Sequence, residues 1–121
     1  MKDRTDLRPN LNLPETAGTT PEERFQNGVL RPVLKLQNDL YLSFSQEYVM
    51  KQRKDYKTLT PADQRNYLAG SLQKDAVLKN TLLGMTLGML TAEELTTYFL
   101  NPGNYNRRMS AMITERVLSQ I

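Results

Sequence analysis

The stretch Leu30-Arg31-Pro32-Val33-Leu34-Lys35-Leu36-Gln37-Asn38-Asp39-Leu40-Tyr41-Leu42-Ser43-Phe44 decides the fold class. Its apolar residues recur at steps of three and four, which is the period of an α-helix, and no part of it alternates with period two. Because these positions cover a wide face, we expect this helix to lie at the centre of the protein. The apolar positions are Leu30, Val33, Leu34, Leu36, Leu40, Tyr41, Phe44 and, just beyond the stretch, Tyr48.

Three further segments show the chemistry of a helix start. Each has a Thr followed three residues later by a carboxylate, as in Thr20-Pro21-Glu22-Glu23, Thr60-Pro61-Ala62-Asp63 and Thr91-Ala92-Glu93-Glu94. A hydroxyl that accepts from the third backbone N–H caps a helix, and Pro is favoured at the first helical position. Together with the apolar period, these starts predict helices over 61–72, 74–90, 92–100 and 104–120.

The first helix is expected to be interrupted. Pro32 has no N–H and its ring clashes with the carbonyl four residues back, and Gly28 lies at that position. We therefore predict a short helix over 21–29, a kink, and a long helix from about 31 to 55. The predicted fold is an all-α compact bundle of about five helices, with a kinked long first helix.

Residues 1–19 differ from the remainder because they lack apolar periodicity and hold Pro9 and Pro14 among polar residues. We expect a flexible N-terminal arm over 1–19 and a single helical-bundle domain over 20–121. The arm lacks the apolar run of a signal peptide, and the longest weakly polar stretch, 81–90, is about half of the roughly 20 residues that cross a bilayer. These features favour a cytoplasmic protein without membrane contact.

The composition narrows the chemistry. The 121 residues contain neither His nor Cys, which excludes catalytic triads that need them and the commonest metal ligands. No cofactor and no metal site are expected. The net charge of +3 is mild, so nucleic acid is not the expected partner.

Polar side chains gather in three clusters that could bind a carboxylate or phosphate. The first follows one stripe of the long helix, the second opens the 74–90 helix, and the third opens the last helix. Ion pairs at the rim of the bundle, such as one between Lys35 and Asp39, are the structural alternative. The candidate ligand-binding residues are Arg31, Lys35, Asn38, Asp39, Lys74, Asp75, Asn80, Arg107 and Arg108.

Two further features allow a structural and a functional interpretation. The basic run 51–57 suits a helix C-terminus, where the dipole favours cations, or weak nucleic-acid binding. Gly84 and Gly88, four residues apart, each cost helix propensity and suggest close approach to another helix, inside the chain or in a second copy. The helix faces that are rich in Met and Tyr could likewise pack in the core of this chain or form an interface with a partner.

The stretch Phe25-Gln26-Asn27-Gly28-Val29-Leu30-Arg31-Pro32-Val33-Leu34-Lys35-Leu36-Gln37-Asn38-Asp39 resembles the opening motif of a small uncharacterised family of bacterial all-helical proteins. Segments 71–75, 80–84 and 106–108 resemble its later signatures. Some of its members carry a glyoxalase-type label, but glyoxalase I-type enzymes are β-rich and hold a metal with His and Glu. The resemblance therefore implies a helical fold and a shared polar band, and no reaction.

We arrive at three functional hypotheses. The first is a non-enzymatic helical protein that acts through self-association, as a dimer, or through binding another macromolecule. The alternative is a small-anion binding protein or an unusual His-free enzyme that uses the band of Arg31, Lys35, Asn38 and Asp39. The third is weak nucleic-acid binding through 51–57.

Overall fold

The computed structural model describes residues 4–9 and 19–121, and within these residues the chain is helical and contains no β-strand. This confirms the predicted all-α class. The α-helices are α1 (Pro21–Phe25), α2 (Arg31–Leu36), α3 (Asn38–Gln52), α4 (Pro61–Lys74), α5 (Ala76–Leu87), α6 (Ala92–Leu100) and α7 (Pro102–Leu118), with a π-turn η2 (Gln26–Leu30) and 3-10 turns η1 (Arg4–Leu7) and η3 (Tyr56–Thr58).

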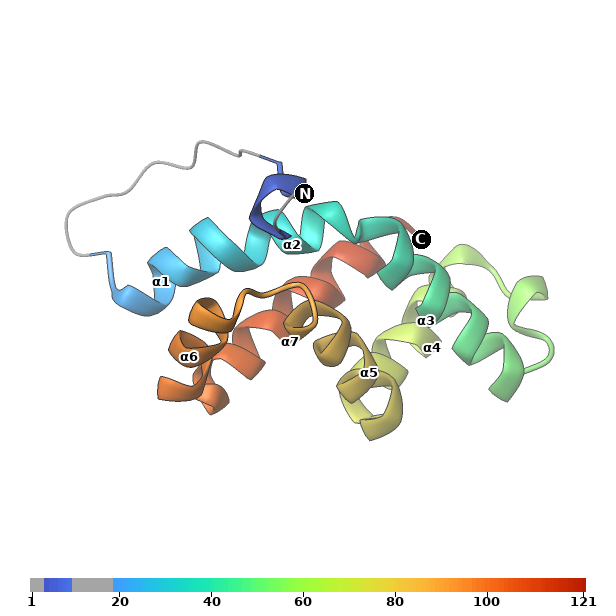
Figure 1. Cartoon of the computed structure of the whole chain (residues 1–121). Coiled ribbons are helices and arrows are strands. Elements are labelled where there is room, and N and C mark those ends of the chain that lie inside the picture. Colours follow the sequence, from blue (N-terminus) through green and yellow to red (C-terminus); the bar gives the residue numbers. More distant parts are fainter. Residues whose placement is uncertain (1–3, 10–18) are drawn as a thin grey trace.

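The first helix is not interrupted at Pro32, contrary to the prediction. Phe25, Leu30 and Arg31 all have right-handed helical backbone angles, and the Arg31 N–H donates to the carbonyl of Gln26, five residues back. The π-turn inserts one extra residue directly before the proline. The chain therefore continues as one rod through α1, η2 and α2 (Figure 1).

The break lies instead at Gln37, which separates α2 from α3. Its backbone has φ −99° and ψ 13°, outside the regular helix. Its side-chain amide donates to the backbone carbonyl of Met85 at 2.7 Å, so a long-range contact fixes the break. The predicted helix over 31–55 is thus two helices, and α3 ends at Gln52, which gives six helical rods where about five were expected.

The central helix is α7, and not the 31–55 segment as predicted. Four of its side chains, spaced four residues apart, are almost fully buried: Tyr105, Met109, Ile113 and Val117. This one stripe packs against α3, α4, α5 and η2, and α6 also contacts the helix. Figure 1 shows α7 crossing the middle of the molecule, with α6 and α3 toward opposite ends.

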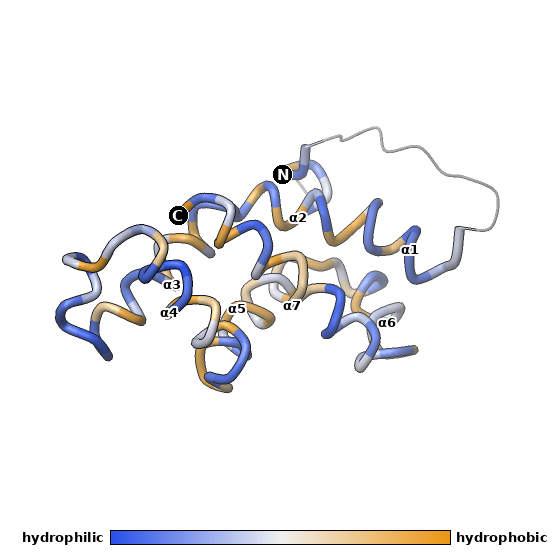
Figure 2. The backbone as a smooth tube through the Cα atoms, turned by 180° about the vertical axis from the view of Figure 1, so that it is seen from behind, coloured by the Kyte–Doolittle hydropathy of each residue, from blue (hydrophilic) through white to orange (hydrophobic). Residues whose placement is uncertain are grey.

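The position of α3 at the edge explains the error. Tyr41, Ser45 and Val49 face the core, but Leu36, Leu40 and Phe44 are 40%, 55% and 38% exposed. The wide apolar face in the sequence is therefore a buried stripe with an exposed stripe beside it. Figure 2 shows hydrophobic and hydrophilic residues in alternating bands along most helices, the usual result of one buried stripe per helix.

The predicted helix starts are confirmed. The hydroxyls of Thr20, Thr60 and Thr91 accept from backbone N–H groups three residues on, at 3.1, 3.2 and 3.1 Å. At Thr91 the Glu94 carboxylate also accepts from the Thr91 N–H at 3.0 Å, which completes a capping box. Local sequence therefore determined where these helices begin.

Most of the predicted N-terminal arm lies outside the described residues, which include only 4–9 and 19 of it. Residues 4–7 form the turn η1, and Leu7 is 49% exposed. Arg8 attaches this segment to the turn between α5 and α6 (see below). No helix among the described residues combines the length and the apolar character needed to span a bilayer.

Candidate functional site

The first predicted cluster, on α2 and α3, is divided between different partners. Arg31 donates through Nε to Asn27 at 2.8 Å. The amide groups of Asn38 and Gln120 exchange two hydrogen bonds, at 3.0 and 2.9 Å, which tie α3 to the end of α7. Lys35 and Asp39 are exposed, and the ion pair expected between them is absent from the described residues.

The second cluster has a structural role centred on Asp75. Its carboxylate accepts from the backbone N–H of Leu78 at 3.1 Å and caps α5. It also accepts from the Tyr48 hydroxyl at 2.9 Å and from the Gln52 amide at 3.1 Å. The Leu78 N–H, with these side chains, lowers the pKa of Asp75 below its usual range. Lys74 and Asn80 are exposed beside it.

The third cluster is also mostly engaged within the fold. Arg108 donates to Asn104 at 2.6 Å and to the Gln26 side chain at 2.7 Å, so it joins α7 to the π-turn. Arg107 is exposed and lines a shallow hollow with Lys79. Lys79 and Arg107 thus bring the second and third clusters to one hollow, but no hollow found among the described residues gathers all three clusters.

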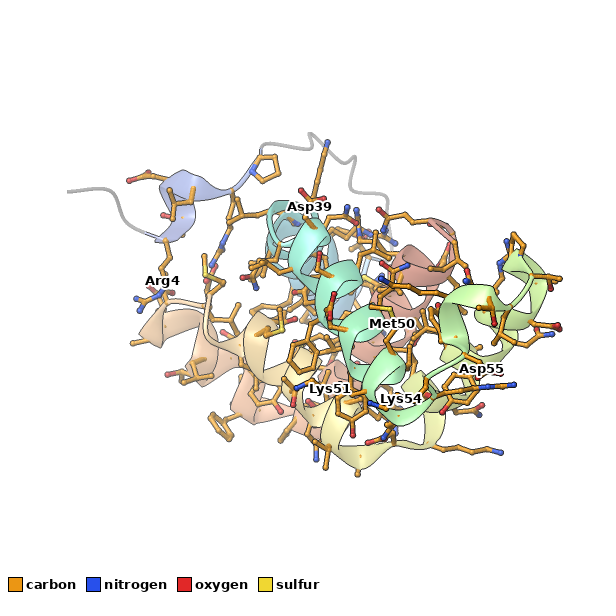
Figure 3. All side chains as sticks on the ribbon, turned by 90° about the vertical axis from the view of Figure 1, so that its right-hand side faces the viewer. Arg4, Asp39, Met50, Lys51, Lys54 and Asp55 are labelled. Carbon is orange, nitrogen blue, oxygen red and sulfur yellow. The ribbon has the colours of Figure 1, made fainter. Side chains whose placement is uncertain are left out.

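The basic run 51–57 does not form a platform for bases. Arg53 pairs with Asp55 at 2.8 Å and lies 5.2 Å from the centre of the Tyr67 ring, and Tyr56 is only 2% exposed. Lys51 and Lys54 remain exposed near the end of α3 (Figure 3). Of the neighbouring tyrosines, Tyr48 already stacks on Phe44 and Tyr56 is buried, so neither presents a free ring face for a base.

No group of three or more carboxylates among the described residues could hold a metal ion. The prediction that the chain has no metal site was made from the missing His and Cys. Two of its carboxylates have structural roles. Glu94 belongs to a capping box and to an ion pair. Asp75 is a cap, as described above.

Sequence reasoning missed the contact made by Arg8. Its guanidinium group donates to both carboxylate oxygens of Glu94 at 2.7 Å and to the Met89 carbonyl at 2.7 Å. The two charged side chains are only 6% and 17% exposed. The pKa of Glu94 lies below its usual range, and the main cause is the hydrogen bonding from Arg8. No short motif signals a pair 86 residues apart.

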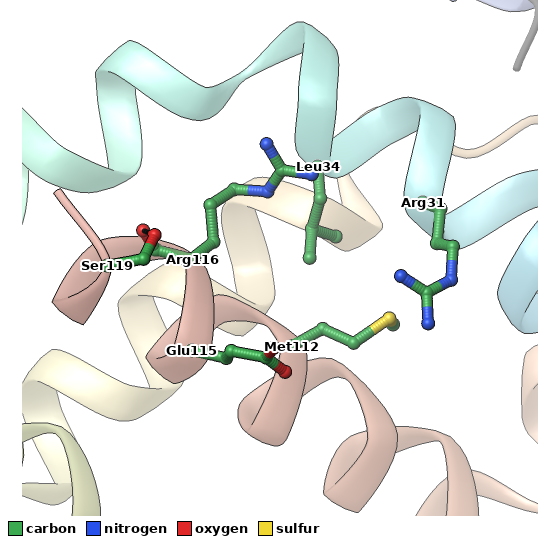
Figure 4. Close-up of a pocket in the computed structure, with 6 residues that line it drawn as sticks. All are labelled: Arg31, Leu34, Met112, Glu115, Arg116 and Ser119. Carbon is green, nitrogen blue, oxygen red and sulfur yellow. Dashed lines mark hydrogen bonds between the residues drawn. The ribbon is translucent and has the colours of Figure 1, made fainter.

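A hollow of about 280 Å³ lies between α2 and α7 and contains one of the predicted residues, Arg31. Figure 4 shows the Arg31 and Arg116 side chains entering it from the two helices, with Leu34 and Met112 between them. Glu115 and Ser119 complete the lining. Arg116 was not among the predicted residues, because its partner across the hollow lies 85 positions earlier in the sequence.

An apolar surface lies along α3 and α5, which run antiparallel side by side. Hydrogen bonds from Gln37 to Met85 and from Tyr48 to Asp75 hold the two helices together at either end. On α5, a Cβ atom added at Gly84 would meet nothing within 4 Å, and one at Gly88 would meet only the backbone of its own helix turn. Among the described residues, therefore, no second helix makes the expected close approach at these glycines.

No family model matches this sequence, and no match was found among the curated proteins or the solved structures. The resemblance carried by residues 25–39 therefore stays an expectation.

Proposed function

We propose that this chain is a non-enzymatic helical protein that acts as a homodimer, joined through the surface of α3 and α5. The observation that carries the proposal is an exposed apolar ridge, formed by Leu36 at the end of α2 and by Leu40 and Phe44 on α3, together with a bare strip of backbone at Gly84 and Gly88 on the neighbouring helix α5. These helices each have another side that is buried in the core.

The ridge is large for a surface helix. Leu40 and Phe44 are four residues apart on α3 and so lie on one face of it, Leu36 ends α2 directly before the break, and the Phe44 ring stacks on Tyr48 with centroids 6.2 Å apart. Single exposed apolar residues are ordinary, but an aligned set points to a contact surface. None of the three carries charge, so little desolvation opposes burial.

The glycine strip supports the same contact. Gly in a helix costs about 1 kcal/mol relative to Ala. Gly84 lies within α5 and Gly88 caps it, and a Cβ atom at either position would meet no other helix within 4 Å in the part of the chain that the structure describes. Bare backbone allows a foreign side chain or helix to approach closely, which would offset that cost.

Ridge and strip together suit a two-fold dimer. In such an interface, residue i of one copy meets residue j of the other and the reverse contact also forms. A projecting ridge beside a flat strip is complementary to its own copy turned through 180°. A small domain also has a small core, and association adds stability.

The test is the solution mass, measured by size-exclusion chromatography with light scattering over a concentration series at low and moderate salt. We expect the mass of two chains at both salt concentrations, since an apolar contact is not screened. Leu40→Lys and Gly84→Leu are expected to give single chains with an unchanged helical circular dichroism spectrum.

Two matched variants serve as controls. Leu100→Lys changes an exposed leucine, 81% exposed, on α6 at the other end of the molecule (Figure 1). Gly28→Leu changes a glycine that also has open space around it, in the π-turn. Both should leave the mass at two chains. A single-chain mass for the unaltered protein at every concentration, or a dimer that survives both test variants, overturns the proposal.

A further inference from the structure

The hollow between α2 and α7 has the composition of a binding site for a small organic anion. It is lined by two arginines, one from each helix, over an apolar floor of Leu34 and Met112 (Figure 4). It does not include any residue of the ridge or the glycine strip, so this inference is independent of the proposed dimer.

Both arginines have unused donors. Arg31 uses only Nε, toward Asn27, so neither terminal nitrogen has a partner among the described residues. The Arg116 side chain makes no hydrogen bond or ion pair there, although it is partly buried. Arg8, Arg53, Arg65 and Arg108, in contrast, all donate to protein oxygens.

The charges leave a net positive site. Glu115 lines the same hollow, but no carboxylate oxygen lies within 4.0 Å of either guanidinium group among the described residues. The two guanidinium groups, which lack carboxylate partners, can each pair with one anionic group, and this favours a ligand that carries two of them. Arginine suits phosphate and carboxylate because its planar group donates two parallel hydrogen bonds.

The backbone contributes little to anion binding here. Arg116 lies in the last turn of α7, where the helix dipole is negative. The Ser119 hydroxyl donates to the Arg116 carbonyl at 2.8 Å and can only accept from a ligand. The anion would therefore be held by the two side chains alone.

The volume of the hollow and its apolar floor restrict the size and the kind of ligand further. About 280 Å³ is near the lower limit for small-molecule sites, which begin at roughly 300 Å³. The floor gives carbon atoms a place to pack, and the Glu115 carboxylate can accept from a ligand hydroxyl. From this geometry we infer that the pocket of Arg31 and Arg116 binds a small organic dianion, a phosphate monoester or a dicarboxylate of a few carbon atoms.

The test is calorimetric titration of the whole chain with glycerol 3-phosphate and with succinate, which separate the two ligand sources. Inorganic phosphate tests the charge alone, while glycerol and acetate test the carbon skeleton and a single carboxylate. All titrations are made at one ionic strength, set with sodium chloride. We expect one of the two organic dianions to bind more tightly than inorganic phosphate, glycerol or acetate.

Arg31→Gln and Arg116→Gln should each weaken binding of that dianion about tenfold or more, as the loss of a charge-assisted hydrogen bond implies. Arg107→Gln, an exposed arginine of the same helix outside the pocket, is the matched control and should bind as the unaltered chain does. Circular dichroism establishes that each variant folds. Absence of binding for both organic dianions, or equal weakening by Arg107→Gln, overturns the inference.

Discussion

Arg8 and Glu94 form a two-pronged ion pair, with both carboxylate oxygens 2.7 Å from guanidinium nitrogens, across 86 positions of sequence. Glu94 also belongs to the capping box of α6, and Arg8 also donates to the carbonyl of Met89. One arginine therefore fastens the N-terminal segment to the turn between α5 and α6.

Removing this arginine should destabilise the fold. Arg8→Ala leaves the Glu94 carboxylate, which is mostly buried, without its charged partner. We expect the free energy of unfolding to fall by about 1–3 kcal/mol, the usual range for a lost hydrogen bond to a charged group. Urea denaturation measures it. Arg4→Ala, at an exposed position of η1, is the control and should change little; equal losses for both variants would contradict the assignment.

The same pair should make stability depend on pH. Because Arg8 lowers the pKa of Glu94 in the folded state, its contribution is complete above the unfolded value of about 4.3 and is lost as the pH falls through the folded value. The difference in urea midpoint between the unaltered chain and Arg8→Ala should therefore shrink from pH 7 to pH 3. A difference that stays constant over that range would show that the ion pair is not its source.

Asp75 should prove structural, although its sequence position suggested a ligand site. Asp75→Ala removes the cap of α5 and the acceptor for Tyr48 and Gln52. Loss of a cap typically costs about 1 kcal/mol, with a range of 0.5–2. The matched variant is Asp39→Ala, an exposed carboxylate that accepts only from Asn38 at 3.3 Å. Thermal unfolding should show a lower midpoint for Asp75→Ala alone.

A buried serine on α3 offers a substitution expected to stabilise the fold. The Ser45 hydroxyl is fully buried and has no hydrogen-bond partner among the described residues. Ser45→Ala removes an unsatisfied polar group and adds a better helix former, so stability should rise by about 1 kcal/mol. A loss of stability on Ser45→Ala would imply that the hydroxyl has a partner.

Thr86→Val is the contrasting variant, at the contact of α3 with α5. The Tyr41 and Thr86 hydroxyls share a hydrogen bond of 2.7 Å, and Thr86 also donates to the Leu82 carbonyl at 3.2 Å. Valine keeps the shape but removes the hydrogen bond that the buried Tyr41 hydroxyl shares with Thr86. Chemical denaturation should show a loss of about 1–3 kcal/mol.

Local chemistry made the helices predictable, but their arrangement depended on contacts between distant residues. Thr20, Thr60 and Thr91 each cap a helix with groups three residues away, so the sequence alone locates those starts. The break at Gln37 depends on the carbonyl of Met85, 48 residues on, and no local pattern reveals it. The central position of α7 could not be predicted for the same reason, because it depends on contacts with helices that are distant in the sequence.

The candidate site was predictable only in part for the same reason. Arg31 was singled out from its stripe, but Arg116 meets it only because α2 packs against α7. Asp75 was interpreted as a ligand, although an Asp directly before a helix is a common cap. That signal was present in the sequence and assigns Asp75 correctly.

The central place of α7 has a consequence during synthesis. Its buried stripe is the shared partner of α3, α4 and α5, all of which leave the ribosome earlier. Until translation has passed residue 118, the nascent chain cannot cover the apolar sides of those helices in their final arrangement. The contacts that complete the packing of α3, α4 and α5 can therefore form only after α7 has been made.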